Sequence, residues 1–207
     1  MDNFYAIFEK EEKFCPTYLE GILHTEFFEK DPFESKNSDF ISPWNVEVQL
    51  PQELWFITKD RKYEFDYRAY RGDGAGFFVS SEFLSLLQEF NISNFQHQKL
   101  HVVNRHKKNV SSKRYFFVHF FNMLEDAIDM EKSNIELYRS GDAIGRIKKI
   151  WDLQLKDSID FPDVFLLRSP KVLSRIFCSE KFKEAVERIN MKGILFVPAS
   201  QADVHRE

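Results

Sequence analysis

The run RYFFVHFFNML, residues 114–124, constrains the fold more than any other feature of this sequence. Apolar residues, many of them aromatic, occupy both alternating positions, whereas a strand with one face in water alternates apolar with polar residues. The run therefore predicts a central strand that is covered on both faces. The 207 residues suffice for one good-sized core, burying roughly 70% of the surface that the unfolded chain exposes. We expect a single domain over residues 1–207.

Several other segments also predict strands. The segment YEFDYRAY, residues 63–70, alternates aromatic with charged residues, as a half-buried strand should. Residues 20–43 are acidic and interrupted by prolines, which indicates a long surface loop or short helical turns. The remaining candidate strands are Phe4–Phe8, Glu53–Thr58, Leu100–Val103, Ile144–Leu153, Val164–Leu167 and Ile194–Pro198.

An internal similarity links two strand–helix–strand units. FVSSEFLSLLQEFNI from Phe78 aligns without a gap to FCSEKFKEAVERINM from Phe177, 99 positions later. Both copies place apolar residues at helical spacing, and a serine before each helix can cap it. We predict two amphipathic helices and a pseudo-repeat of this unit. The fold class expected is α+β, mainly antiparallel sheet with a few amphipathic helices.

Composition and charge narrow the cellular setting. The first residues contain no basic segment leading into a long apolar run, so neither a signal peptide nor a transit peptide is expected. The longest apolar runs are far shorter than the roughly 20 residues of a membrane helix. The two cysteines, Cys15 and Cys178, form no metal or disulfide pattern. The sequence therefore predicts a cytoplasmic protein without a membrane partner.

The glycine-rich segment RGDGAG, residues 71–76, does not fit a phosphate-binding loop. A dinucleotide fingerprint needs a third glycine at Phe77, and a P-loop needs a Gly-Lys-Ser/Thr sequence that is absent here. The segment also leads into a predicted strand, so no helix end is available to hold a phosphate. We interpret it as the corner of a β-hairpin.

Metal and nucleic-acid sites are weakly indicated. On a strand, His97 and His101 would lie about 13 Å apart, too far to share an ion with each other or with His106. No cofactor and no bound metal are therefore predicted. The basic segment 104–114 lacks an RNA-binding signature in an acidic chain and is interpreted as a solvated hairpin turn, so no nucleic-acid partner is predicted.

One alternative catalytic site remains. Glu125, Asp126 and Asp129 form the densest acidic cluster and could bind magnesium in a phosphoesterase or nuclease. The competing interpretation is a strand leaving the core into solvent, because no partner histidine, lysine or glycine-rich loop has a recognisable spacing to the cluster. We expect no enzyme activity and keep this metal-dependent reaction as the alternative.

Three motifs of the C-terminal half carry a resemblance to a known family. They are Leu167-Arg168, Cys178-Ser179 before the second helix, and the strand GILFVP from Gly193. In their order and spacing they resemble a family of bacterial immunity proteins from polymorphic toxin systems. Residues 114–133 are similar to a further segment of that family. The similarity covers roughly residues 60–200, leaving 1–60 as a variable part, and Cys178 replaces the usual valine.

The resemblance implies an antitoxin that binds and neutralises a cognate secreted toxin. A homo-oligomer is compatible with this role. Residues 1–40 carry ten acidic and four basic residues, and such a surplus can steer a basic partner. We therefore expect the acidic stretch Glu26, Glu29, Asp31 and Glu34 to face the toxin.

Overall fold

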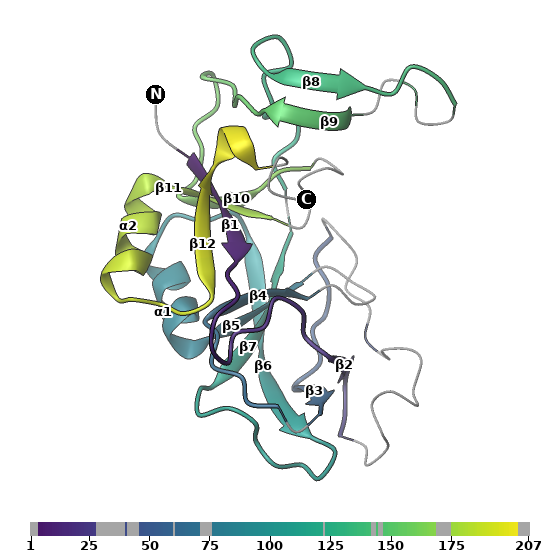
Figure 1. Ribbon diagram of the computed structural model, residues 1–207, viewed down its shortest axis with the longest axis vertical. Helices are drawn as coiled ribbons and strands as arrows, with labels where there is room; N and C mark the ends of the chain where they lie inside the picture. Colours follow the sequence, from purple (N-terminus) through teal and green to yellow (C-terminus); the bar gives the residue numbers. More distant parts are fainter. Residues whose placement is uncertain are drawn as a thin grey trace.

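The computed structural model describes residues 4–27, 40, 46–59, 61–70, 76–121, 123–141, 144, 147–168 and 175–202. These residues form three β-sheets and two α-helices (Figure 1). The expected α+β class with mainly antiparallel pairing is confirmed. The elements are β1 Phe4–Glu9, β2 Gly21–His24, β3 Leu54–Thr58, β4 Tyr67–Tyr70, β5 Gly76–Ser80, α1 Ser81–Glu89, β6 Phe95–Asn104, β7 Tyr115–Phe120, β8 Asn134–Leu137, β9 Ile147–Asp152, β10 Val164–Leu166, β11 Ile176–Ser179, α2 Glu180–Arg188, β12 Ile194–Pro198 and the 3-10 helix η1 Ala199–Gln201.

The largest sheet has six strands in the order β2-β3-β6-β7-β5-β4. Its pairs are antiparallel except for β3 and β6, which run parallel. Strand β7 lies inside this sheet, where Phe117 joins the core on one face and Val118 and Phe120 join the core on the other. The prediction of a central strand covered on both faces is confirmed.

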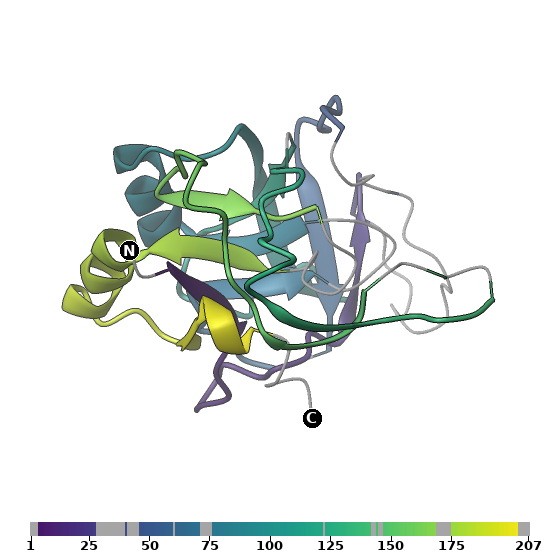
Figure 2. The same ribbon diagram turned by 90° about the horizontal axis from the view of Figure 1, so that it is seen from above.

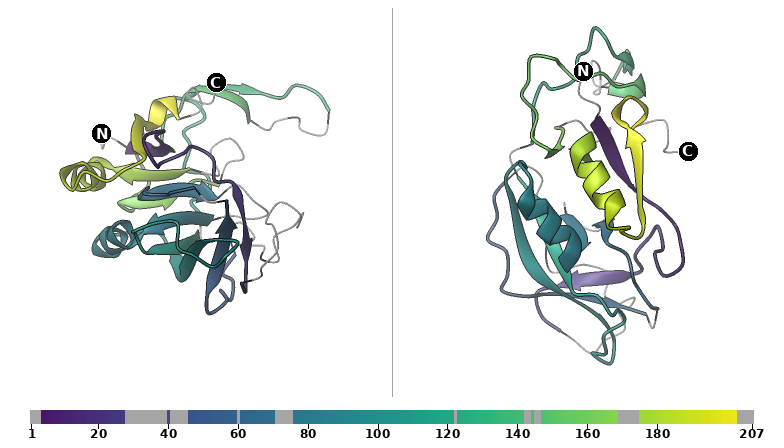
Figure 3. Two further views of the ribbon diagram at one scale, coloured as in Figure 1. Left: turned by 60° about the horizontal axis from the view of Figure 1, so that its bottom comes forward. Right: turned by 90° about the vertical axis from the view of Figure 1, so that its left-hand side faces the viewer.

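The second sheet has four antiparallel strands in the order β10-β11-β1-β12. The two sheets and both helices enclose one hydrophobic core, and the helices lie side by side along it (Figures 2 and 3). Phe83 of α1 and Phe182 of α2 meet in this core with ring centroids 5.9 Å apart in an edge-to-face arrangement. This aromatic pair joins the two helices directly.

Both predicted helix caps are confirmed. The backbone N–H of Phe83 donates to Ser80 Oγ at 3.1 Å, and that of Phe182 donates to Ser179 Oγ at 3.3 Å. Each bond satisfies one N–H that the first helical turn leaves free. Each helix thus begins directly after a strand and turns its apolar stripe inward.

The two strand–helix–strand units have the same topology. In the first, β5 and β6 both flank β7; in the second, β11 and β12 both flank β1. Ser80 pairs with Tyr115 and Lys99 with Phe116, while the residues 99 positions later, Ser179 and Pro198, pair with Phe4 and Tyr5. The sequence offset therefore holds through both flanking strands. Descent from a duplication stays a prediction.

Two sequence predictions were wrong in part. Residues 20–43 were expected to be irregular, yet Gly21–His24 form β2, which pairs with β3. Four residues are too few to show a period, and Gly21 lies against the Phe56 ring, where a larger side chain would clash. Residues 63–66 of the expected strand 63–70 lie outside β4, because loop backbones accept their hydrogen bonds: Tyr63 N–H donates to Val110 O at 3.0 Å.

The predicted glycine corner and basic turn connect strands as expected. Strand β4 pairs antiparallel with β5 across residues 71–75, which lie outside the described residues, and β6 pairs antiparallel with β7 across the basic segment. Among the residues that the structure describes, no helix is long and apolar enough to cross a membrane.

Candidate partner-binding surface

A two-stranded ribbon made of β8 and β9 projects from the body of the molecule (Figures 1 and 3). The ribbon is anchored by Ile150, which is fully buried, and by Ile135 and Ile147, which pack on the core behind the four-stranded sheet. Its register shifts between Asn134 and Ile135 and again between Glu136 and Leu137. Such shifts re-aim side chains locally. We call the described residues of this segment, 134–141, 144 and 147–152, the arm.

The arm exposes a group of large apolar side chains. The exposed fractions are 37% for Leu137, 39% for Tyr138, 67% for Ile144 and 41% for Trp151. All four line one shallow hollow of about 790 Å³, together with Ile135, Glu136 and Arg139. Scattered exposed apolar residues are ordinary, but a contiguous group of them marks an interaction surface.

Charged groups border this hollow. Lys148 Nζ donates to Glu136 Oε1 at 2.6 Å, and this hydrogen bond holds the pKa of Glu136 below its usual value. Lys149 Nζ lies 5.5 Å from the centroid of the Trp151 ring, a cation–π distance. The surface thus combines aromatic faces with positive charge.

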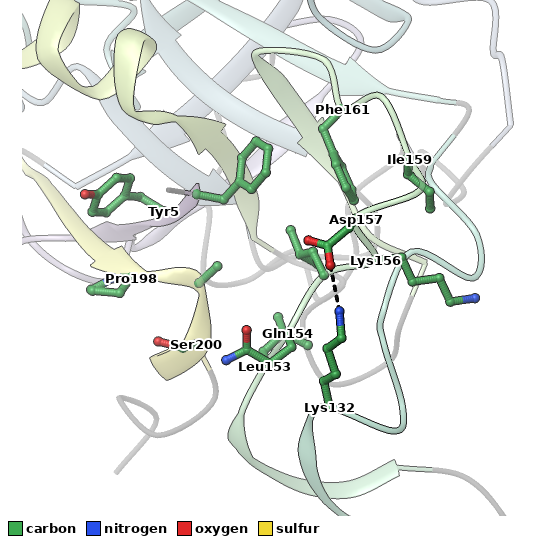
Figure 4. A pocket seen from close by; sticks show the side chains of 13 residues that line it. Tyr5, Lys132, Leu153, Gln154, Lys156, Asp157, Ile159, Phe161, Pro198 and Ser200 are labelled. Carbon is green, nitrogen blue, oxygen red and sulfur yellow. Dashed lines mark hydrogen bonds and ion pairs between the residues drawn. The ribbon is translucent and has the colours of Figure 1, made fainter. Parts of the chain in front are cut away.

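A second hollow, of about 530 Å³, lies where β1, β12 and residues 153–161 meet (Figure 4). Leu153, Ile159 and Phe161 supply apolar walls. Lys132 Nζ reaches across to Asp157 Oδ2 at 2.6 Å. Chemically this site can hold an apolar group beside an ion pair. Its lining residues are Phe4, Tyr5, Lys132, Leu153, Gln154, Leu155, Lys156, Asp157, Ile159, Phe161, Pro198, Ala199 and Ser200.

The acidic cluster of the alternative enzymatic interpretation does not converge. Glu125 forms an ion pair with Arg168. Asp129 Oδ1 accepts the backbone N–H groups of Lys132 and Glu131, each at 3.1 Å, and these bonds hold the pKa of Asp129 below its usual value. The described part of the chain contains no group of three or more His, Cys, Asp or Glu side chains placed to hold a metal ion. The structure does not support the metal-dependent alternative.

The predicted acidic contact is described at one residue. Glu26 is exposed just after β2, whereas Glu29, Asp31 and Glu34 lie outside the described residues. Beside Glu26, the Phe27 ring lies 5.6 Å from that of Trp55.

The histidines considered as metal ligands have other surroundings. His101 stacks on Trp55 with ring centroids 3.9 Å apart, and its Nε2 lies 3.2 Å from Glu53 Oε1. His97 lies on the same strand β6 as His101, and its Nε2 is 3.4 Å from Nε2 of Gln88 in α1. His106 lies in the turn after β6. The three side chains are not brought together.

A family model described as Immunity protein 43 matches residues 7–205. The chain belongs to this family. None of the curated proteins matches the chain. The resemblance seen in the sequence is thereby confirmed, and the match extends beyond residues 60–200 to include almost all of the N-terminal part.

In this Immunity protein 43 member, sequence analysis missed the arm surface. Residues 144–153 were predicted as a strand, but its partner β8 was not, because Asn134–Leu137 are too short for a clear period. One signal was present: Trp151 stands between Ile150 and Asp152, in the alternate position that faces away from the core. A tryptophan at an outward strand position is an interaction signal.

Sequence analysis also missed Arg68, the largest fully buried side chain among the residues that the structure describes. Its guanidinium donates to the backbone oxygens of Pro16, Tyr67, Gly193, Lys10 and Cys15, at 2.6–3.0 Å. Arg68 thereby ties β4 to the N-terminal loop and to the turn before β12. Its role is structural.

The two thiols are buried and inert. Desolvation by burial raises the pKa of Cys15 and that of Cys178. A raised pKa keeps a thiol protonated at neutral pH, and the thiolate is the reactive form. Cys178 therefore serves as core packing in this protein.

Proposed function

We propose that this protein neutralises a cognate bacterial toxin by forming a stoichiometric complex with it in the cytoplasm. The observation that carries the proposal is the Immunity protein 43 match over residues 7–205. The exposed aromatic group of the arm supports it, because binding proteins act through surfaces of this composition.

Because the proposed protein acts by binding and not by catalysis, its binding surface must provide a sufficient affinity. Protection at low copy number requires nanomolar affinity or better, which corresponds to about −12 kcal/mol of binding free energy. An interface of this strength covers about 1,600 Å² in total, counting both partners. A single hollow is therefore too small, and the contact must extend along one face of the molecule.

The test is a titration of toxin activity. A candidate toxic domain is taken from the genes neighbouring that of this protein and purified, and its activity is measured against increasing amounts of this protein. We expect activity to fall linearly to zero at a fixed molar ratio. Toxin activity that does not change with the antitoxin concentration contradicts the proposal. Complete inactivation of the toxin by much less than an equimolar amount of antitoxin also contradicts it, because it would indicate catalysis.

We further propose that the acidic stretch Glu26, Glu29, Asp31 and Glu34 speeds capture of a basic toxin surface. Long-range attraction raises association rates and weakens with salt. Charge reversal at the four positions should slow association about tenfold or more at low ionic strength. An unchanged association rate would remove this stretch from the interface.

A further inference from the structure

The outward apolar residues of the arm are not needed to hold it in place. Ile135, Ile147 and Ile150 already fix the ribbon on the core behind the four-stranded sheet. Trp151, Leu137 and Ile144 leave more than a third of their surface exposed around a common hollow. An isolated two-stranded ribbon is only marginally stable in water. Exposed apolar side chains on such an element are unfavourable for the free protein in water. Burying them against a partner would remove this penalty.

The charge of the arm defines that partner further. Arg139 is exposed and lines the hollow, near the Glu136 carboxylate to which Lys148 donates. Lys149 lies over Trp151, where docking would remove both from water. Across its described residues the arm carries Arg139, Lys148 and Lys149 against Glu136 and Asp152. A complementary surface must therefore supply carboxylates beside an apolar contact.

Shape completes the description. The arm projects past the body of the molecule, so it can enter a recess in a partner (Figure 3). Tyrosine, tryptophan and arginine are the residue types that dominate binding energy at protein interfaces. All three occur within this small hollow.

We infer that the arm is the principal toxin-binding element and that it docks into an apolar cleft of the toxin bordered by carboxylates. This inference rests on the proposed function and adds the site and the chemistry of its partner surface. The arm and the acidic stretch carry opposite charge, so each would contact a differently charged region of the toxin. Charge reversal in one of them therefore tests a different part of the interface from charge reversal in the other.

The experiment measures binding to the toxic domain that this protein neutralises in the titration above, by calorimetry or biolayer interferometry. We expect Trp151→Ala and Tyr138→Ala each to weaken the Kd by about 30-fold or more. Arg139→Glu should weaken it more than Arg139→Gln does, because a glutamate would face the carboxylates of the partner.

Matched controls lie elsewhere on the surface. Tyr18 is 65% exposed outside the arm, so Tyr18→Ala matches Tyr138→Ala. Arg114 is exposed immediately before β7, so Arg114→Glu matches Arg139→Glu. Both controls should bind like the wild type. Circular dichroism and thermal unfolding identify any variant that does not fold, and the exposed Arg139 variants keep the test valid in that case.

The outcomes separate the two proposals. Wild-type binding that all arm variants retain overturns the inference and leaves the proposed function intact. Absence of wild-type binding overturns both. Hydrogen exchange gives an independent readout: amides of residues 134–141 and 147–152 should exchange more slowly in the complex, and unchanged exchange there contradicts the inference.

Discussion

At the scale of single residues, the charged side chains of residues 63–70 have an unexpected role. Sequence alternation placed Glu64, Asp66 and Arg68 on a solvent-facing side, yet all three are buried. Asp66 Oδ2 accepts the backbone N–H of Lys192 at 2.7 Å, and Arg68 donates to carbonyls of two distant loops. Alternation reports which side chains share a face, but it cannot report that a loop from elsewhere in the chain covers that face.

Replacing Arg68 should therefore be costly. Arg68→Met keeps the apolar stem of the side chain and removes five donated hydrogen bonds. The carbonyls of Cys15 and Gly193 then keep one backbone donor each, the N–H groups of Glu12 and Lys10. We expect the free energy of unfolding to fall by at least about 3 kcal/mol. Urea denaturation measures it, with the exposed Arg114→Met as control. A loss below about 1 kcal/mol would contradict the structural role.

Glu64 gives a prediction about pH. Burial alone would raise the pKa of Glu64, but Ser112 donates to it from both Oγ and N–H, and Lys62 Nζ lies at 3.2 Å, so its pKa is lowered overall. Because the pKa of Glu64 is lower in the folded protein than in the unfolded chain, its ionised carboxylate stabilises the folded state at pH values above the unfolded pKa of about 4.3. This stabilisation is lost as the pH falls through the folded pKa.

Ser112→Ala should thus reduce stability in a pH-dependent way. At pH 7 we expect a loss of about 1 kcal/mol, because the carboxylate keeps fewer donors. The difference between variant and wild type should shrink below about pH 4 as Glu64 becomes protonated. Urea denaturation at a series of pH values measures this, and a difference that is constant down to pH 3 argues against the assignment.

At the scale of elements, the helices were the most predictable part of the fold. Each begins after a capping serine, and Phe83 and Phe182 stand at equivalent positions of the aligned segments. Local signals of this kind lie within one short stretch of sequence. That these two residues contact each other depends on how the sheets pack, and no local signal contains it. For the same reason β2 and β8 were not predicted, because their pairing partners β3 and β9 are separated from them by long connections.

The contact between the two helices can be measured by a double-mutant cycle. Phe83→Leu and Phe182→Leu each remove one ring of the edge-to-face pair while keeping most of the apolar volume. We expect the double variant to be more stable than the sum of the single losses predicts, by about 0.5–1.5 kcal/mol. A matched cycle with Phe83→Leu and Phe8→Leu, whose side chains belong to different core clusters, should show additivity. Additivity in the first cycle would show that the rings are not coupled.

At the scale of the whole molecule, the two units have the same strand register in two different sheets. In the first unit the central strand β7 follows β6 directly, whereas in the second the central strand β1 precedes all others in the chain. Pro198 of β12 pairs with Tyr5 of β1, so the free ends of these strands are neighbours. Sequence comparison revealed the shared offset, but the insertion of β1 between β11 and β12 is a long-range pairing that single-sequence patterns do not contain.

A circular permutant tests this arrangement. Residue 207 is joined to residue 1 through a flexible linker of about ten residues, and the chain is opened between His106 and Lys107, which are exposed in the turn between β6 and β7. In the permutant β12 leads into β1, as β6 leads into β7 in the natural chain. We expect a folded protein with the wild-type circular dichroism spectrum and a Tm within a few degrees of it, because the paired strands and buried cores are kept.

A second opening gives the matched control for this permutant. Opening the same joined chain inside β7, between Phe117 and Val118, divides a strand whose two halves contribute to both main cores. That permutant should be strongly destabilised, since a buried strand would end in two charged termini. The opposite outcome is that the opening between residues 106 and 107 prevents folding as completely as the opening in β7. It would mean that the direct connection from β6 to β7 is required for folding, and that the two units are not interchangeable in how their strands are connected.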